Sequence, residues 1–262
     1  MTRLIEGREA LAAAVASVRG LGLGPRPGVS IALAGAESDA AFRSAKASAQ
    51  AKLRAFTRAG VSAAVVGEIR EGLVIVQRPW PGPKVAPLFK FMDLDFWPGA
   101  GWERPAVCDA AYRIHRALCS PGVGVAIVGS RGYFGRHLVE QVREGGGVCQ
   151  GFDVGDDLRD LQGFDHVLAV AGASEILTAE HLTPRQTVID LGYSVCAERG
   201  LGNVARVAYQ VPAVLVPVPG GMGPFQMVVL LERYLAAVGI DRLPGAWPDL
   251  AADAMKATGI GV

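Results

Sequence analysis

Three glycines and one aspartate are spaced as in a site that binds a dinucleotide. The segment VAIVGSRGYFG places Gly129, Gly132 and Gly135 between an apolar run and an amphipathic stretch. Glycines there let the backbone approach a pyrophosphate, and the N-terminus of the following helix offers free N–H groups. Asp153 stands 18 residues after Gly135, at the end of the next apolar run, where an acid can bind ribose hydroxyls. A tight turn and a solvated acid are the structural alternatives.

The residues around Asp153 favour NAD over NADP as the cofactor. A carboxylate at this position repels a 2′-phosphate. Residues 145–158 contain no lysine or arginine that could pair with such a phosphate. The sequence therefore predicts binding of NAD.

A second segment is unusually rich in residues that restrict or free the backbone. From Pro217 to Pro224 the chain reads PVPGGMGP, with three prolines and three glycines in eight residues. A simple turn needs only one such residue. The pattern therefore predicts a rigid path along which another molecule approaches the backbone closely.

Short apolar runs alternate with longer amphipathic stretches, which predicts an α/β fold. Strands are expected at 29–35, 62–67, 73–77, 124–129, 147–153, 165–172, 186–192 and 213–218. Helices are expected at 37–60, 106–118 and 136–146, and from Gly223 onwards. A strand, a helix and a strand in this order form a right-handed parallel crossover. Two such units, joined by the proline-rich segment 78–105, predict two α/β domains flanking a cleft, the second being Rossmann-like.

Composition excludes several classes of protein. Half of the 262 residues are hydrophobic, 19% are charged and the net charge is +1, so neither disorder nor a nucleic-acid partner is predicted. No apolar run reaches about 18 residues, so no membrane span is predicted. The four cysteines and four histidines lack the spacing of zinc ligands. No disulfide or metal site is predicted, and a reducing cytoplasm fits this cysteine usage.

Motifs in the same order along nearly the whole chain resemble the bifunctional methylenetetrahydrofolate dehydrogenase/cyclohydrolase family. The most specific is PVPGGMGPFQ, which resembles Pro-Val-Pro-Gly-Gly-Val-Gly-Pro-Met-Thr. The others are SIALAGAESDAAFRSAK, VQRPWP, MDLDFW, IVGSRGYFGR and VIDLGYS. The resemblance implies NAD(P)-dependent oxidation of 5,10-methylenetetrahydrofolate to 5,10-methenyltetrahydrofolate, which a cyclohydrolase step can follow.

The resemblance also implies the roles of individual residues. Lys46 matches the catalytic lysine, Gln77 the glutamine that supports it and Asp95 the acid that holds the pterin. Asp93, two residues before Asp95, is the alternative acid. A partly desolvated lysine can move protons near neutral pH, and a carboxylate can accept paired N–H bonds from an aminopyrimidine. The other implied substrate-binding residues are Phe42, Val76, Arg78, Pro219, Gly220, Gly221 and Gly223. The implied cofactor-binding residues are Gly129, Ser130, Arg131, Gly135, Arg136, Asp153, Gly172 and Tyr193.

Departures from the family's pattern gather around the implied pockets. Phe42 stands where the family has a tyrosine four residues before the lysine, and Arg78 and Met92 replace a leucine and a lysine. Loss of the tyrosine hydroxyl affects the cyclohydrolase step most, because that step needs an activated water, whereas hydride transfer needs mainly positioning. Two alternatives stay open: a non-redox folate-dependent one-carbon transferase or hydrolase, and a non-catalytic folate-binding protein.

The resemblance divides the chain into a folate and catalytic domain, residues 1–120 with 225–262, and an NAD(P)-binding domain, residues 121–224. It implies a folate substrate and a homodimer. Neither nucleic acid nor a membrane is predicted as a partner.

Overall fold

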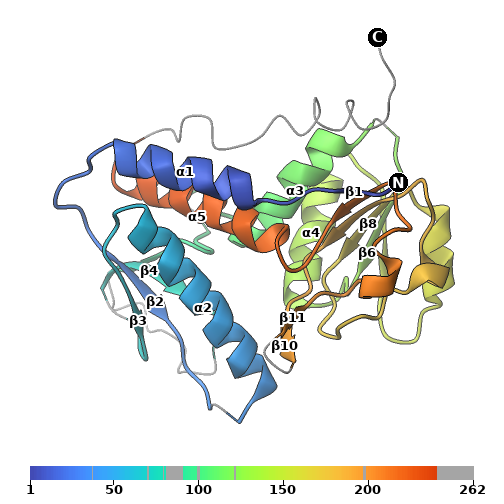
Figure 1. Cartoon of the computed structure of the whole chain (residues 1–262), viewed down its shortest axis with the longest axis horizontal. Coiled ribbons are helices and arrows are strands. Elements are labelled where there is room, and N and C mark those ends of the chain that lie inside the picture. The colour runs from blue at the N-terminus through green and yellow to red at the C-terminus, as the bar shows by residue number, and fades with distance from the viewer. Residues whose placement is uncertain are drawn as a thin grey trace. The chain divides into compact units, whose positions relative to one another are not determined.

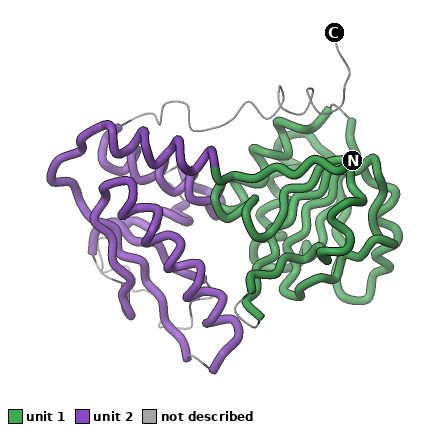
Figure 2. The backbone as a smooth tube through the Cα atoms, in the orientation of Figure 1, with its two compact units in different colours: residues 1–8, 107–225, 247–262 green, residues 9–106, 226–246 purple. Residues whose placement is uncertain are grey.

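The computed structural model describes residues 1–36, 38–69, 71–78, 80, 91–98, 101–120, 122–196 and 199–240. The chain divides into two compact units, which Figure 2 shows in different colours. Unit 1 comprises residues 1–8, 107–225 and 247–262, and unit 2 comprises residues 9–106 and 226–246. Each unit contains a parallel sheet and helices, so the predicted α/β class is confirmed.

Unit 2 is built on a four-stranded parallel sheet with the strand order β3-β2-β4-β5 (Figure 1). Its strands are β2 (Val29–Ala32), β3 (Ala63–Val66), β4 (Gly72–Val76) and β5 (Phe91–Asp93). Ile31, Val74 and Ile75 are fully buried, as expected for inner strands of a parallel sheet. Strand β5 was not predicted, because three residues within a proline-rich segment carry no periodic pattern.

The helices of unit 2 include α2 (Ala40–Arg58), which packs on β2 and β3 (Figure 1). It begins after Asp39, whose carboxylate accepts a hydrogen bond from the Ala41 N–H at 2.8 Å and so caps the helix. The other two are α1 (Arg8–Gly20) and most of α5 (Met222–Ala237). The Phe56 ring on α2 meets the Tyr234 ring on α5 edge-on, with 5.9 Å between their centroids.

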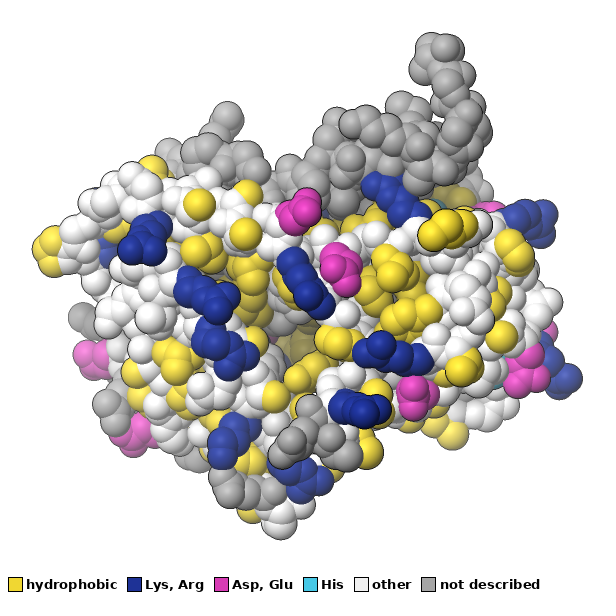
Figure 3. All heavy atoms as spheres, viewed as in Figure 1, with side chains coloured by type: hydrophobic (Ala, Val, Ile, Leu, Met, Phe, Trp, Pro, Cys, Tyr) yellow, Lys and Arg dark blue, Asp and Glu magenta, His cyan; other side chains and the backbone are white. Residues whose placement is uncertain are grey.

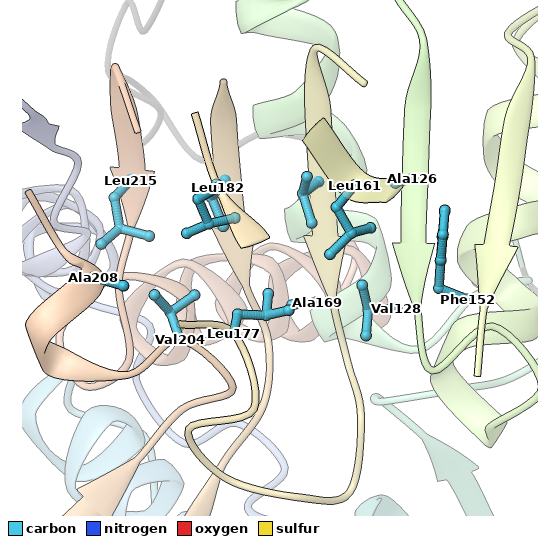
Figure 4. Close-up of a cluster of buried hydrophobic side chains, with 12 residues drawn as sticks. Ala126, Val128, Phe152, Leu161, Ala169, Leu177, Leu182, Val204, Ala208 and Leu215 are labelled. Carbon is cyan, nitrogen blue, oxygen red and sulfur yellow. The ribbon is translucent and has the colours of Figure 1, made fainter. Parts of the chain in front are cut away.

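Unit 1 is built on a six-stranded sheet with the order β1-β12-β9-β8-β6-β7, in which every pair is parallel. Its strands are β1 (Arg3–Leu4), β6 (Val125–Val128), β7 (Cys149–Phe152), β8 (His166–Ala169), β9 (Thr187–Asp190) and β12 (Val214–Val216). Apolar side chains from the strands and from the segments after them form one core, which Figure 4 shows. Leu161, Leu177 and Leu182 are the largest buried members of this core that lie outside the strands.

The remaining elements of unit 1 connect these strands. They are α3 (Ala106–Leu118), α4 (Tyr133–Glu144), the antiparallel pair β10 (Ser194–Cys196) and β11 (Arg199–Leu201), and the 3-10 helices η1 (Leu158–Gly163), η2 (Ala179–His181) and η3 (Arg206–Ala208). Helix α3 contributes His115, whose Nδ1 lies 3.0 Å from Nδ1 of His166 in β8.

The observed units differ from the predicted division at both ends of unit 1. Residues 1–8 belong to unit 1, because β1 pairs with β12. Helix α3 also falls within unit 1 except for Ala106, its first residue, whereas the predicted division places residues 1–120 in the folate and catalytic domain.

On the face that Figure 3 shows, lysine and arginine side chains are more frequent than acidic ones across the middle of the view. Among the described residues, no helix combines the length and the hydropathy needed to cross a membrane.

Candidate functional site

Polar side chains of unit 2 gather where β4 and β5 end. Gln77 directly follows β4, Asp93 is the last residue of β5 and Asp95 comes two residues later. Because β4 and β5 are adjacent and parallel, their carboxyl ends lie at the same edge of the sheet. All three side chains are at least nine-tenths buried, which is unusual for polar groups and marks this edge as a candidate site.

Lys52 on α2 completes this cluster. Its side chain is only 2% exposed, and its Nζ donates to Oε1 of Gln77 and to Oγ of Ser48, both at 2.8 Å. Burial lowers the pKa of Lys52 from 10.5 to about 8, against the opposing effect of the negative charges of Asp95 and Asp93. A lysine with a lowered pKa exchanges its proton near neutral pH, which suits acid–base chemistry.

Asp93 ties the ends of the two strands together. Its Oδ1 accepts hydrogen bonds from the N–H groups of Val76 at 3.2 Å and Asp95 at 3.0 Å, while its Oδ2 lies 3.4 Å from Nη2 of Arg78. Burial, followed by the charge of Asp95, raises the pKa of Asp93 to about 7. The Arg78 guanidinium also lies 5.8 Å from the centroid of the Phe96 ring, in the range of a cation–π contact.

The structure corrects the pairing of Lys46 with Gln77. Lys46 is exposed on α2, and the lysine that bonds Gln77 is Lys52. Six residues are about one and two-thirds helical turns, so the two lysines point to different sides of α2. The residue one turn before Lys52 is Ser48 and not Phe42, which packs over Gly35.

The sequence held a signal for Lys52 that motif matching missed. The buried face of α2 contains Ala45, Ala49, Lys52 and Phe56, at intervals of four, three and four residues. A lysine on an apolar helical face must be buried, and buried lysines are rare without a partner. Val76, another predicted substrate-binding residue, is buried in β4 beside this cluster.

In unit 1, two of the glycines after β6 lie where there is no room for a side chain. Gly129 has φ +86°, and a Cβ on it would lie 2.9 Å from the backbone of Ala171. A Cβ on Gly135, in the first turn of α4, would lie 2.0 Å from the Gly129 carbonyl oxygen. Only glycine fits at these two positions, so the turn brings bare backbone to the N-terminus of α4.

Asp153 lies beside this turn, as the sequence predicted. It follows β7 and accepts hydrogen bonds from Oγ of Ser130 at 2.5 Å and from the N–H of Arg131 at 3.1 Å. The Arg131 guanidinium Nε is 3.5 Å from the same carboxylate. Gly151 makes the approach of Ser130 possible, because a Cβ there would lie 2.2 Å from the Ser130 Oγ.

The other predicted cofactor residues follow neighbouring strands or lie on α4. Gly172 follows β8, Tyr193 follows β9 and is 44% exposed, and Arg136 is exposed in the first half of α4. Carboxyl ends of parallel strands meet at one edge of a sheet, so the segments after β6, β7, β8 and β9 share an edge. This edge is where open α/β sheets bind nucleotides.

A buried clamp at the same edge was not predicted. Asp190, at the end of β9, is fully buried and accepts hydrogen bonds from the N–H groups of Gly192, Asn203 and Val204, each at 2.9 Å. The Asn203 side chain in turn accepts from the Ala171 N–H and donates to the Ala171 carbonyl, both at 2.9 Å. Burial raises the pKa of Asp190 to about 7, although the three N–H groups act in the opposite direction. The clamp joins the segments that follow β8 and β9.

The PVPGG segment follows β12 in unit 1, and the chain's own packing accounts for its glycines. The Val218–Pro219 peptide is cis, Gly220 has φ +106°, and a Cβ on Gly221 would lie 2.5 Å from the Pro217 carbonyl oxygen. The Gly220 carbonyl accepts a hydrogen bond from the Gly7 N–H at 3.0 Å. At Gly223, by contrast, no atom of the described residues outside the helix's own backbone and the neighbouring residues lies within 4 Å of an added Cβ. Whether a ligand approaches Pro219 to Gly223 stays a prediction.

Within the described parts of the chain, no group of three or more histidine, cysteine, aspartate or glutamate residues could hold a metal ion.

The parallel sheet, the glycine turn into α4 and the acid after β7 define unit 1 as a Rossmann-like dinucleotide-binding domain. Residues 121–241 match the family model described as tetrahydrofolate dehydrogenase/cyclohydrolase, NAD(P)-binding domain. This match covers most of unit 1, including the glycine turn and Asp153.

The chain is also similar to curated bifunctional FolD proteins. The chain is 37% identical over 87 residues to a bifunctional protein FolD of Chloroflexus aggregans, which covers 32% of this chain and 30% of that protein. It is 29% identical over 152 residues to the FolD of Cupriavidus taiwanensis, covering 53% and 51%. These alignments therefore span about half or less of the curated relatives.

The fold also resembles that of solved FolD structures. That of Campylobacter jejuni has a TM-score of 0.71 at 17% identity, covering 91% of this chain and 99% of that one. That of Trypanosoma brucei, in complex with NADP and an inhibitor, has a TM-score of 0.70 at 20% identity, covering 90% and 97%.

Proposed function

We propose that this protein is a methylenetetrahydrofolate dehydrogenase, which oxidises 5,10-methylenetetrahydrofolate to 5,10-methenyltetrahydrofolate with NAD, and that it also hydrolyses the product. The observation that carries the proposal is the buried contact of Lys52 with Gln77, beside Asp93 and Asp95, in a chain whose other unit matches the NAD(P)-binding domain of this family. A buried lysine costs stability, so a chain that keeps one has a use for it.

Asp95 is the proposed ligand of the pterin. Its Oδ1 accepts a hydrogen bond from the Ala106 N–H at 3.2 Å, and its own N–H donates to Asp93. The hydrogen bonds to this carboxylate from described residues all end on Oδ1, which leaves Oδ2 for the N–H groups of an aminopyrimidine. A fixed carboxylate of this kind orients a flat heterocycle through charge-assisted hydrogen bonds.

Lys52 is the proposed acid–base group. Its lowered pKa lets the neutral amine form near neutral pH and take a proton from the water that attacks the methenyl carbon. As the ring opens, the carbon–N5 bond breaks and N5 gains a proton, which gives the 10-formyl product. Gln77 holds the amine in place but cannot pass a proton on through its amide oxygen.

Ser48 gives this lysine a route to solvent. Its Oγ accepts a hydrogen bond from the Lys52 Nζ, and its side chain is half-buried whereas Lys52 is enclosed. A hydroxyl can accept one proton while it releases another, so it supplies what Phe42 could not. The proposal therefore includes the cyclohydrolase step.

The residues of unit 1 fit a nicotinamide dinucleotide. Gly129 and Gly135 leave room for a pyrophosphate at the N-terminus of α4, and Asp153 stands where ribose hydroxyls would lie. When bound, the cofactor supplies the acceptor for the hydride. The carboxylate of Asp153 favours NAD, although the Trypanosoma brucei structure contains NADP, so the preference needs a direct comparison.

One assay tests this function. Purified protein is incubated with 5,10-methylenetetrahydrofolate and either NAD or NADP, and the formation and hydrolysis of the methenyl product are followed. We expect methenyl formation with a higher kcat/KM for NAD. Folded protein that binds a tetrahydrofolate compound but neither cofactor would instead support a non-redox transferase or a folate-binding protein.

We also propose a homodimer, because the resemblance to the family implies one. Sedimentation velocity at several protein concentrations tests this proposal, and a monomer at all concentrations would contradict it.

A further inference from the structure

Arg233 is a buried charge that the proposed chemistry does not use directly. It lies on α5, in the stretch MVVLLERYLAA, which is apolar apart from Glu232, Arg233 and the Tyr234 hydroxyl, and it is only 5% exposed. Moving a guanidinium out of water is costly unless its N–H groups are hydrogen-bonded. The position of Arg233 therefore calls for partners of specific geometry.

Three backbone carbonyl groups near the candidate site accept hydrogen bonds from Arg233. Its Nη1 donates to the Leu94 carbonyl at 3.1 Å and to the Asp95 carbonyl, and its Nη2 donates to the Arg104 carbonyl at 2.8 Å. Leu94 and Asp95 directly follow β5, and Arg104 stands two residues before α3 begins. The planar guanidinium thus links the residues that follow β5 to the segment that precedes α3. The compact, flexible ammonium of a lysine cannot make this set of contacts.

Asp95 is consequently held at each of its backbone polar groups. Its N–H donates to Oδ1 of Asp93 at 3.0 Å, and its carbonyl accepts from Arg233 and from the Ala106 N–H at 3.0 Å. The same Ala106 N–H also lies 3.2 Å from Oδ1 of the Asp95 carboxylate. The direction of Oδ2 therefore depends on where Arg233 fixes the backbone.

We propose that Arg233 is a positioning residue that sets the Asp95 carboxylate for ligand binding in unit 2. This proposal rests on the proposed function for the identity of the ligand, a tetrahydrofolate. Arg233 acts through the backbone of Asp95 and does not itself touch the ligand.

The test compares Arg233→Lys with a matched control on the same helix. Tyr234→Phe also removes a buried side-chain hydrogen bond to a carbonyl of unit 2, that of Pro27 at 3.2 Å, but this carbonyl belongs to a different segment. We expect Arg233→Lys to raise the KM for 5,10-methylenetetrahydrofolate about tenfold with little change in kcat, and Tyr234→Phe to leave KM unchanged. Arg233→Gln, which loses the charge as well, serves as a second variant if the lysine variant does not fold.

A double-mutant cycle separates positioning from general stability. In an Asp95→Asn background, Arg233→Lys should have little further effect on the KM for the folate, because both changes act on one contact. Independent, multiplicative losses would overturn the proposal, and so would an unchanged KM in Arg233→Lys with the Asp95 carboxylate intact.

Hydrogen exchange provides a readout that does not need the folate. We expect faster exchange of the Asp95 and Ala106 amides in Arg233→Lys than in wild type, with the β2 amides unchanged. If the wild-type protein binds no folate, the proposed function fails, but faster exchange at Asp95 still supports the positioning role. Unchanged exchange at these amides would overturn it.

Discussion

Replacing Lys52 by methionine is expected to make the protein more stable and inactive at the same time. A site that lowers the pKa of this lysine from 10.5 to about 8 costs roughly 3 kcal/mol for the charged form at pH 7. Lys52→Met removes this cost and keeps most of the side-chain volume. It also leaves Oε1 of Gln77 without the ammonium, a loss of about 1.5 kcal/mol. The free energy of unfolding at pH 7 should therefore rise by about 2 kcal/mol.

Urea denaturation followed by tryptophan fluorescence measures the unfolding of unit 2, which contains Lys52. Trp80, Trp97 and Trp102 all belong to unit 2. The matched control is Lys46→Met on the same helix, which is exposed and should change the free energy of unfolding by less than about 0.5 kcal/mol. Dehydrogenase and cyclohydrolase rates are measured in parallel. We expect Lys52→Met to lose at least about 100-fold in the cyclohydrolase rate and Lys46→Met to lose nothing.

The pH dependence of the free energy of unfolding distinguishes the effect of the lysine charge from a general packing effect. The pKa of Lys52 is lower in the folded than in the unfolded state, so wild type gains stability as the pH rises from 8 towards 10.5. The gap between wild type and Lys52→Met should close over that interval. If Lys52→Met is instead less stable at pH 7, the attraction of Asp93 and Asp95 outweighs burial. The lysine is then part of a structural charge cluster, and the reasoning is refuted.

Three further changes test separate parts of the molecule. Ser48→Ala should slow the cyclohydrolase reaction about tenfold or more and leave the rate of hydride transfer unchanged. Ser48→Thr, which keeps a hydroxyl, should restore the cyclohydrolase rate. Equal loss of both rates would contradict the proposed proton route. Asp153→Ser should raise kcat/KM for NADP relative to kcat/KM for NAD, because Arg131 is then available to a 2′-phosphate. An unchanged preference would exclude Asp153 as the residue that selects the cofactor. Burial lowers the pKa of both His115 and His166 to about 4. Between pH 7 and pH 5 the free energy of unfolding of wild type should therefore fall by roughly 3–4 kcal/mol relative to a variant with leucine at both positions. Hydrogen exchange in β8 measures this difference, and parallel pH curves for the two proteins would contradict it.

The fold and the nucleotide turn could be predicted from the sequence because their signals are local. The apolar runs that predicted strands at 29–35 and 124–129 correspond to β2 and β6, with differences only at the ends. Gly129 and Gly135 are six residues apart, and their need for glycine comes from one turn of the chain. Asp153 was found because the crossover between two parallel strands has a nearly constant length.

The contacts that were missed join residues far apart in the sequence. Asp190 bonds N–H groups up to 14 residues away, and Arg233 bonds the Asp95 carbonyl 138 residues away. No local pattern distinguishes such side chains from solvated ones. Lys46 and Lys52 illustrate the same limit, because motif matching considers residue type and order, whereas the helical face decides which lysine is enclosed.

The PVPGG segment has the rigid, closely packed backbone that its composition predicted, but for a different reason. Its prolines and glycines predicted a rigid, close-packed path, and Gly221 does lie where a Cβ would meet the Pro217 carbonyl oxygen. The approach that demands glycine there comes from the chain itself, so the composition alone is no evidence of a ligand. Lys52 and Arg233 are the opposite case, because each is a buried charge whose hydrogen bonds end on residues in or beside the candidate site. A charge enclosed at a cost to stability is therefore the stronger indication of function in this molecule.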